Sequence, residues 1–170
     1  MENFKQKLPR IKTFLFDVDG VLTNGQVFLM ENGEFVRNMN SKDGYALQLA
    51  VKKGYRIAII TGGSSQIVKK ALNGLGIEDV FLKQGDKLQC YKDYINEHSL
   101  IEEEILYMGD DLPDYEVMKR VGVATCPKNS AHEIKEICIY ISGKNGGEGC
   151  VRDIIEQVMR SQDKWEITGW

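Results

Sequence analysis

Three short apolar runs, each followed at once by polar residues, constrain the fold of this chain more than any other feature. They cover residues 11–16, 56–60 and 105–108. Runs of this length and composition are typical of strands buried on both faces, as in parallel sheets. The residues that follow are Asp-Val-Asp-Gly, Thr-Gly-Gly and Gly-Asp-Asp. Because parallel strands end at a common edge, where α/β proteins bind ligands, we expect these polar groups to meet there.

Helical patterns alternate with the strand-like runs. We expect helices at about 43–54, 65–75, 87–97, 117–121 and 149–159, and further strands at 80–82, 123–124 and 137–141. Residues 130–133, Ser-Ala-His-Glu, look like a capping box at the start of another helix. At least five strand–helix alternations predict an α/β fold, a three-layer Rossmann-like parallel sheet with helices on both faces.

A segment with a different pattern follows the first strand. Residues 26–30 and 34–38 alternate in polarity and flank Glu-Asn-Gly at 31–33, which predicts a β-hairpin. We expect a hairpin flap over about 24–40, no large cap domain, and a tail without a clear element over about 161–170. The length of 170 residues suggests one domain over 1–170.

Composition excludes several classes of partner. The net charge of −3 provides no basic surface for nucleic acid or an anionic membrane. No apolar stretch approaches the 18 or so residues of a membrane span, and the first residues lack an apolar signal core. The four cysteines form no C-x-x-C motif, so we expect reduced thiols, and we expect a cytoplasmic protein.

Two acids directly after the first predicted strand indicate a bound cation. Asp17 and Asp19 follow the first strand, and unpaired carboxylates there would be costly to bury. At 4 Å two such charges repel by roughly 4 kcal/mol at an effective dielectric near 20. With Thr61, Lys87 and Asp110 at the same edge, the set suits phosphoryl transfer: a carboxylate attacks phosphorus, Mg²⁺ offsets the repulsion, and hydroxyl, N–H and ammonium groups hold the oxygens.

These segments, Asp-Val-Asp-Gly-Val-Leu-Thr at 17–23, Thr-Gly at 61–62, Lys87 and Gly-Asp-Asp-Leu-Pro-Asp at 109–114, resemble the four motifs of the haloacid dehalogenase superfamily of phosphatases. The resemblance implies that Asp17 is the nucleophile and forms an aspartyl-phosphate, and that Asp19 is the general acid and base. It implies phosphate binding by Thr61, Gly62 and Lys87. It also implies a Mg²⁺ site, with supporting acids behind it: the ligands are Asp17, the Asp19 carbonyl and Asp110, and the supporting acids are Asp111 and Asp114.

Further segments resemble the phosphatases of 3-deoxy-D-manno-octulosonate 8-phosphate (KDO 8-phosphate), which act in lipopolysaccharide biosynthesis. They are Asn-Gly-Glu at 32–34, Asn-Ser-Lys-Asp-Gly-Tyr at 40–45, Gly-Asp-Lys at 85–87, and Gly-Gly-Glu-Gly at 146–149 with Val-Arg at 151–152. The resemblance implies a homotetramer whose hairpins and neighbouring subunits cover the pocket. It also implies contacts with the sugar acid from Asn40, Ser41, Lys42, Asp43, Gly44 and Gln48.

Two positions depart from that pattern and leave alternatives open. Many of these phosphatases have basic residues where this chain has Gly63 and Ala71. Lys42, Lys69 or Lys70 could instead supply the positive charge that binds the substrate carboxylate. A nine-carbon sialic-type 9-phosphate is an alternative substrate. A receiver-like signalling domain is a more remote alternative, since receivers also combine a phosphorylated Asp, an acidic pair, Thr and Lys. Their acidic pair ends an early strand, however, and the phosphorylated residue comes later. A non-catalytic subunit would have little need of all four motifs.

Overall fold

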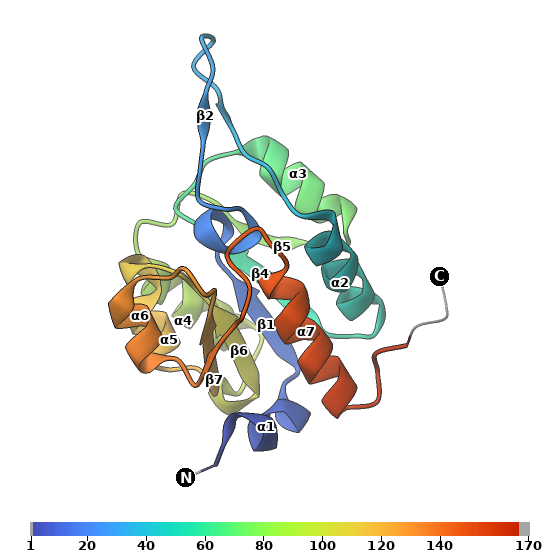
Figure 1. The fold of residues 1–170 in the computed structure, drawn as a ribbon. Coiled ribbons are helices and arrows are strands. Elements are labelled where there is room, and N and C mark those ends of the chain that lie inside the picture. The colour runs from blue at the N-terminus through green and yellow to red at the C-terminus, as the bar shows by residue number, and fades with distance from the viewer. Residues whose placement is uncertain (1, 167–170) are drawn as a thin grey trace.

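A six-stranded parallel sheet forms the centre of the computed structural model, which describes residues 2–166 (Figure 1). Its order is β5-β4-β1-β6-β7-β8. The strands are β1 (Thr13–Phe16), β4 (Arg56–Ile60), β5 (Asp79–Phe81), β6 (Ile105–Met108), β7 (Val123–Cys126) and β8 (Tyr140–Ile141). From β1 the chain first winds to β4 and β5, then returns to β6 on the other side of β1. The predicted ligand-binding edge therefore has its switch point between β1 and β6.

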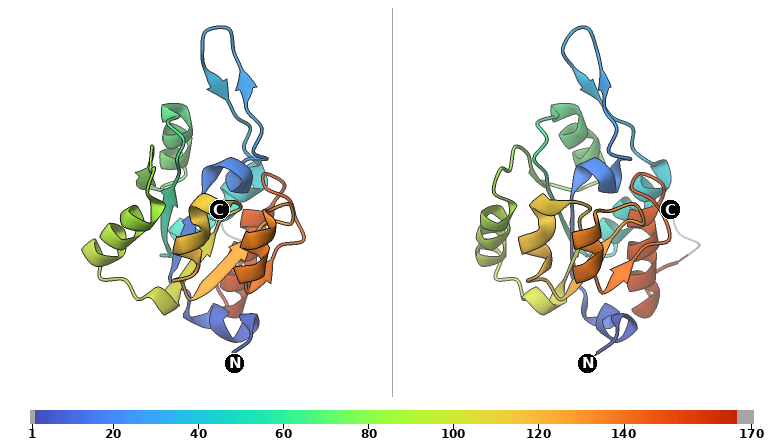
Figure 2. Two further views of the ribbon diagram at one scale, coloured as in Figure 1. Left: turned by 90° about the vertical axis from the view of Figure 1, so that its left-hand side faces the viewer. Right: turned by 60° about the vertical axis from the view of Figure 1, so that its left-hand side comes forward.

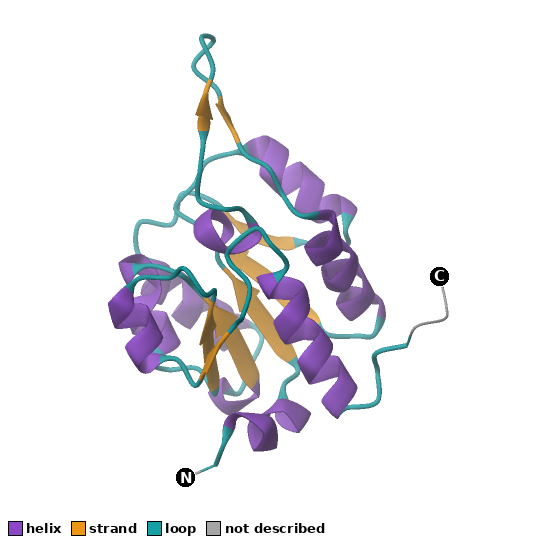
Figure 3. Ribbon diagram, in the orientation of Figure 1, coloured by secondary structure: helices purple, strands orange, loops and turns teal. Residues whose placement is uncertain are grey.

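Helices cover both faces of the sheet (Figure 3). Successive side chains of a strand point to opposite faces, so Phe14 and Phe16 join one buried cluster and Leu15 the other. The first cluster lies under α2 (Ser41–Lys52), α3 (Gln66–Gly74) and α7 (Cys150–Ser161), and the second under α4 (Lys87–Glu97), α5 (Tyr115–Met118) and α6 (His132–Ile137). This arrangement confirms the predicted three-layer α/β fold.

Short helical segments complete the fold. The N-terminal pair, α1 (Phe4–Lys7) and η1 (Leu8–Arg10), precedes β1, and η1 contacts α7. Three further turns are η2 (Val18–Leu22), η3 (Glu102–Glu104) and η4 (Leu112–Asp114). Within residues 2–166, no helix has the length and apolar character that crossing a bilayer requires. All four cysteines are free thiols.

The predicted hairpin is present and extends away from the body of the molecule (Figure 2). Its strands, β2 (Phe28–Leu29) and β3 (Phe35–Val36), have only two residues each, and Gly33 adopts a positive φ in the turn. Six large apolar side chains on it are between 41% and 73% exposed, namely Val27, Phe28, Leu29, Met30, Phe35 and Val36. The alternating sequence therefore forms a flap without a buried face of its own.

Several predicted boundaries were wrong. Residue 137 ends α6 rather than beginning a strand, so β8 is limited to two residues. The expected capping box at 130–133 does not form, because the Ser130 hydroxyl donates to the Pro127 carbonyl and Ala131 is the N-cap. In the tail, Trp165 packs edge-on against Tyr45, whereas Trp170 lies outside the described residues. The one-domain organisation stays a prediction.

Candidate active site

Residues from four segments surround one cavity at the carboxyl edge of the sheet. The cavity has a volume of about 500 Å³. The residues that line it are Asp17, Asp19, Gly25, Thr61, Gly62, Gly63, Gln84, Gly85, Lys87, Asp110, Asp111, Pro113 and Asp114. They include every residue predicted from the sequence to bind metal or phosphate or to take part in catalysis. The residues predicted to contact the sugar acid do not line it.

At the base of the cavity, Lys87 joins two buried carboxylates. Its Nζ lies 2.9 Å from Asp17 Oδ1 and 2.8 Å from Asp114 Oδ1, and its side chain is 5% exposed. Burial disfavours the charged ammonium, but Asp114 and Asp17 outweigh burial and raise the pKa of Lys87. Lys87 begins α4, where Asp86 is the N-cap and accepts from the amide of Gln89. The start of this helix therefore places a protonated lysine beside the proposed nucleophile.

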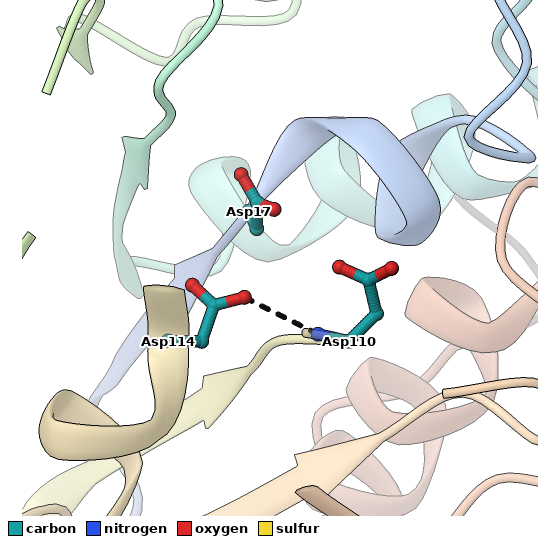
Figure 4. Close-up of side chains that lie close together, drawn as sticks. All are labelled: Asp17, Asp110 and Asp114. Atoms are coloured by element: carbon teal, nitrogen blue, oxygen red, sulfur yellow. Dashed lines mark hydrogen bonds between the residues drawn. The ribbon is translucent and has the colours of Figure 1, made fainter. Parts of the chain in front are cut away.

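Asp114 is held from three sides. Its Oδ1 accepts from Lys87 and, at 2.7 Å, from the hydroxyl of Tyr107, which is fully buried on β6. Its Oδ2 accepts from the Asp110 amide at 3.3 Å (Figure 4). Burial, together with the adjacent Asp114 carboxylate, raises the pKa of Tyr107 well above its ordinary value, which keeps the phenol a donor. Asp114 therefore holds Lys87 at the cavity, and its role as a supporting acid stays a prediction.

The acids around Asp17 fit a magnesium ion. Carboxylate oxygens of Asp17, Asp110 and Asp114 lie within 4.8 Å of one another (Figure 4). Burial and the nearby Asp114 charge, opposed by Lys87, together raise the pKa of Asp17 to about 7. Burial, then the Asp17 charge, likewise raises the pKa of Asp110 to about 7. Oxygen donors whose charges destabilise one another suit Mg²⁺, which needs only one or two carboxylates and retains waters. Both oxygens of Asp114 already accept hydrogen bonds, whereas only Oδ1 of Asp17 contacts Lys87, so the geometry is compatible with the predicted side-chain ligands Asp17 and Asp110.

Asp19 lines the cavity and is bound there by Arg37, a residue of the hairpin segment. Arg37, one residue after β3, donates from Nε to Asp19 Oδ1 at 2.6 Å and from Nη2 to Oδ2 at 3.1 Å. The Arg37 side chain is only 11% exposed. This carboxylate raises the pKa of Arg37, mainly through the hydrogen bond. Both oxygens of the proposed general acid are therefore engaged by one guanidinium.

The end of β4 supplies the groups expected to hold phosphate. Thr61 is buried, and its hydroxyl accepts from the Gly63 amide at 3.1 Å. Gly62 is exposed and lines the cavity. A hydroxyl and backbone amides at this position suit the equatorial oxygens of a phosphate.

Two glycines shape the loop that follows Asp17. Gly20 has φ +88°, and a Cβ there would collide with the Asp110 carboxylate. Gly146, in the loop before α7, packs on that loop, since its own Cβ would collide with the Gly20 carbonyl. The adjacent Gly147 donates to the Val21 carbonyl at 2.9 Å. The loop before α7 therefore supports the nucleophile loop from outside.

Residues predicted to contact the sugar acid lie elsewhere or have other partners. Asn40 is the N-cap of α2. Its side-chain oxygen accepts from the backbone amide of Lys42, and its side-chain nitrogen donates to the Gly147 carbonyl. Asp43 is 1% exposed and accepts from the Arg152 amide at the start of α7, so it has a packing role. Lys42 lines a separate cavity along α7. Ser41, Gly44 and Gln48 lie on α2 and line neither cavity.

Sequence reasoning missed Tyr107 and Arg37. Tyr107 lies in an apolar run, and its ring packs in the core, so the sequence pattern indicates a core residue and not a hydrogen-bond donor at the site. Arg37 lies in the hairpin, and nothing local in the sequence connects it with Asp19. A usable signal for Tyr107 was its polar atom in a strand otherwise without one, since a buried hydroxyl requires a partner.

Comparisons with known proteins agree with this geometry. A sequence profile described as haloacid dehalogenase-like hydrolase matches residues 77–154. The chain is 30% identical over 161 residues to the 3-deoxy-D-manno-octulosonate 8-phosphate phosphatase KdsC of Yersinia pestis, covering 95% of this chain and 86% of that protein. It is 31% identical over 158 residues to the Escherichia coli K12 enzyme of the same name, covering 93% of this chain and 84% of that protein.

Solved structures share the fold along most of their length. A probable YrbI family phosphatase from Pseudomonas syringae pv. phaseolica superposes with a TM-score of 0.91 at 36% identity, covering 94% of this chain and 91% of that one. The KDO 8-phosphate phosphatase of Moraxella catarrhalis, in complex with magnesium, phosphate and KDO, superposes with a TM-score of 0.90 at 33% identity, covering 94% and 91%. A related structure therefore contains the ion that the acidic cluster fits.

Proposed function

Since the chain belongs to the haloacid dehalogenase superfamily and is a phosphoric monoester hydrolase, we propose that it is Mg²⁺-dependent and removes phosphate from a phosphorylated sugar acid. The proposed substrate is KDO 8-phosphate, on which several relatives act by name, and the products are KDO and inorganic phosphate. The observation that carries the proposal is the contact of Lys87 with both Asp17 and Asp114 beside Asp110.

The residues of the cavity suggest a two-step reaction. An oxygen of Asp17 attacks phosphorus and forms an aspartyl-phosphate while the bond to the leaving oxygen breaks. Asp19 gives that oxygen a proton, then accepts one from the water that hydrolyses the aspartyl-phosphate. Lys87, the Thr61 hydroxyl and the Gly62 amide hold the phosphoryl oxygens. When bound by Asp17, Asp110 and the Asp19 carbonyl, Mg²⁺ would offset the repulsion between nucleophile and substrate.

A panel of substrates tests the proposal. Steady-state rates are measured with KDO 8-phosphate, nonulosonate 9-phosphates and simple sugar phosphates side by side. We expect the highest kcat/KM with KDO 8-phosphate, loss of activity with EDTA and recovery with Mg²⁺. A clear preference for a 9-phosphate would favour the alternative substrate, and activity that persists in EDTA would contradict the metal site.

The exposed hairpin supports a further proposal, a homotetramer in which hairpins contact neighbouring subunits. Its apolar side chains, Phe28, Leu29 and Phe35 among them, are more than half exposed in the single chain, and such a patch is typical of interfaces. Light scattering at micromolar concentration tests it, and a monomer would contradict it. Serine at these three positions should dissociate the assembly, whereas Ile101→Ser, at an equally exposed apolar residue outside the hairpin, should not. The cytoplasmic location stays a prediction.

A further inference from the structure

The pair formed by Arg37 and Asp19 lies where two cavities meet. The catalytic cavity is bounded on this side by Asp19, Thr61 and Gly63. A second cavity of about 430 Å³ lies between the hairpin and the start of α3, lined by residues 33–37 and 64–68. Between them lies a crevice of only about 10 Å³, lined by members of both, including Asp19 and Arg37. A substrate that extends from the catalytic cavity toward the hairpin cavity would therefore pass Arg37.

Positive charge is scarce along this path. Among the described residues that line these cavities and the crevice, Lys87 and Arg37 are the only cations. Lys87 is already bound to Asp17 and Asp114. The catalytic cavity contributes five carboxylates and the hairpin cavity Glu34. A substrate that carries a second anionic group beyond its phosphate would therefore have Arg37, paired here with Asp19, as the one other cation along this path.

The pair also competes with the proposed role of Asp19 in proton transfer. Each oxygen of Asp19 accepts a hydrogen bond from Arg37, so a proton passed between Asp19 and the leaving oxygen would displace or share one of these bonds. Gly63 lies beside this pair: a Cβ there would be 3.5 Å from Asp19 Oδ2 and 3.8 Å from Arg37 Nη2, both ordinary van der Waals distances. An anionic group of the substrate is the natural replacement partner, because guanidinium binds carboxylate and phosphate in the same bidentate manner.

We propose that Arg37 binds an anionic group of the substrate and is held by Asp19 until that group arrives. This inference rests on the proposed phosphatase function and adds the residue that recognises the far end of the substrate. Binding of the anion frees Asp19 at the moment when the ester is in place. The anion is either the carboxylate of a sugar acid or the phosphate itself, and the two sources differ in which substrates need Arg37.

The test compares Arg37→Gln with the parent protein on KDO 8-phosphate and on p-nitrophenyl phosphate, which has no carboxylate. Loss of a hydrogen bond to a charged group should lower kcat/KM for the sugar-acid phosphate by about 10- to 100-fold, mainly through KM. An unchanged value for p-nitrophenyl phosphate identifies the carboxylate as the partner, whereas an equal loss identifies the phosphate. Arg37→Lys should restore part of the loss.

Arg120→Gln is the matched control, since Arg120 pairs with Glu102 at 2.8 Å and lines none of these cavities. It should leave both substrates unaffected. Unchanged or increased kcat/KM with Arg37→Gln on every phosphate ester that the parent hydrolyses would overturn the inference. Failure of the parent protein on all sugar-acid phosphates would instead refute the proposed substrate, and Arg37 would then be judged by p-nitrophenyl phosphate alone.

Discussion

At the base of the active site, Lys87 is 5% exposed and is held by carboxylates on two sides, whereas at the mouth Arg37 comes from a hairpin with most of its apolar surface exposed. The base is built on strand ends and the first turn of a helix, which packing keeps rigid. The mouth depends on two-residue strands outside the sheet. The chemistry is thus preorganised, while the part that meets the rest of the substrate can adjust.

The largest expected effect tests whether Asp17 at the base is the nucleophile. Asp17→Asn should reduce kcat by on the order of 10⁴-fold or more, because an amide is a poor nucleophile and catalytic residues that act as a unit lose most activity together. Circular dichroism should show an unchanged fold. Asp93→Asn, an exposed acid on α4, is the control. Near-native turnover of Asp17→Asn would refute the assignment.

A second substitution removes the cation from the base. Lys87→Met leaves the buried carboxylates of Asp17 and Asp114 without the cation that they share, so unfolding in urea should show a loss of about 3 kcal/mol. We also expect kcat/KM to fall at least about 10²-fold, since an ammonium no longer holds the phosphoryl oxygens. Lys119→Met, at an exposed pair with Glu116, should change stability by about 0.5 kcal/mol or less. Equal stabilities for the two variants would show that the base is less rigid than its burial indicates.

Asp19 lies between the two regions and should show an intermediate effect. Asp19→Ala should lower kcat by about 10²-fold or more, the usual contribution of a general acid and base. The loss should shrink with p-nitrophenyl phosphate, whose leaving group needs little protonation. An unchanged rate with a sugar phosphate would rule out proton transfer by this residue.

The smallest effect concerns Asp43, which lies outside both regions. Burial raises the pKa of Asp43 in the folded protein above its ordinary value near 4. In the window between the two values the native state holds more protons than the unfolded one, so the free energy of unfolding falls as pH rises from about 4 upward. Asp43→Asn lacks this titration and should show a shallower fall. Asp17 and Asp110 titrate in both the parent protein and the variant. Parallel curves of unfolding free energy against pH would therefore contradict the assignment to Asp43.

The same contrast explains what could be predicted from sequence. The apolar composition of strands such as 11–16 indicates that they are buried, and the acids that follow them indicate the edge of the sheet where they meet. The residues at the base of the site could therefore be predicted. Helix boundaries around 130–141 were not, because Ser130 bonds backward to Pro127 instead of capping α6. The bond from Arg37 to Asp19 depends on how the end of the hairpin lies beside the loop after β1, and no local pattern contains that information.

The close approach of Gly146 to Gly20 has a consequence for biosynthesis of the enzyme. The nucleophile segment leaves the ribosome early, but the glycine loop that buttresses it is translated only when most of the chain has been made. Nascent chains, and fragments that stop before this loop, therefore contain Asp17 and Asp19 but lack the residues that pack against the segment after the first strand. We expect the chain to hydrolyse phosphate esters only when its synthesis is nearly complete.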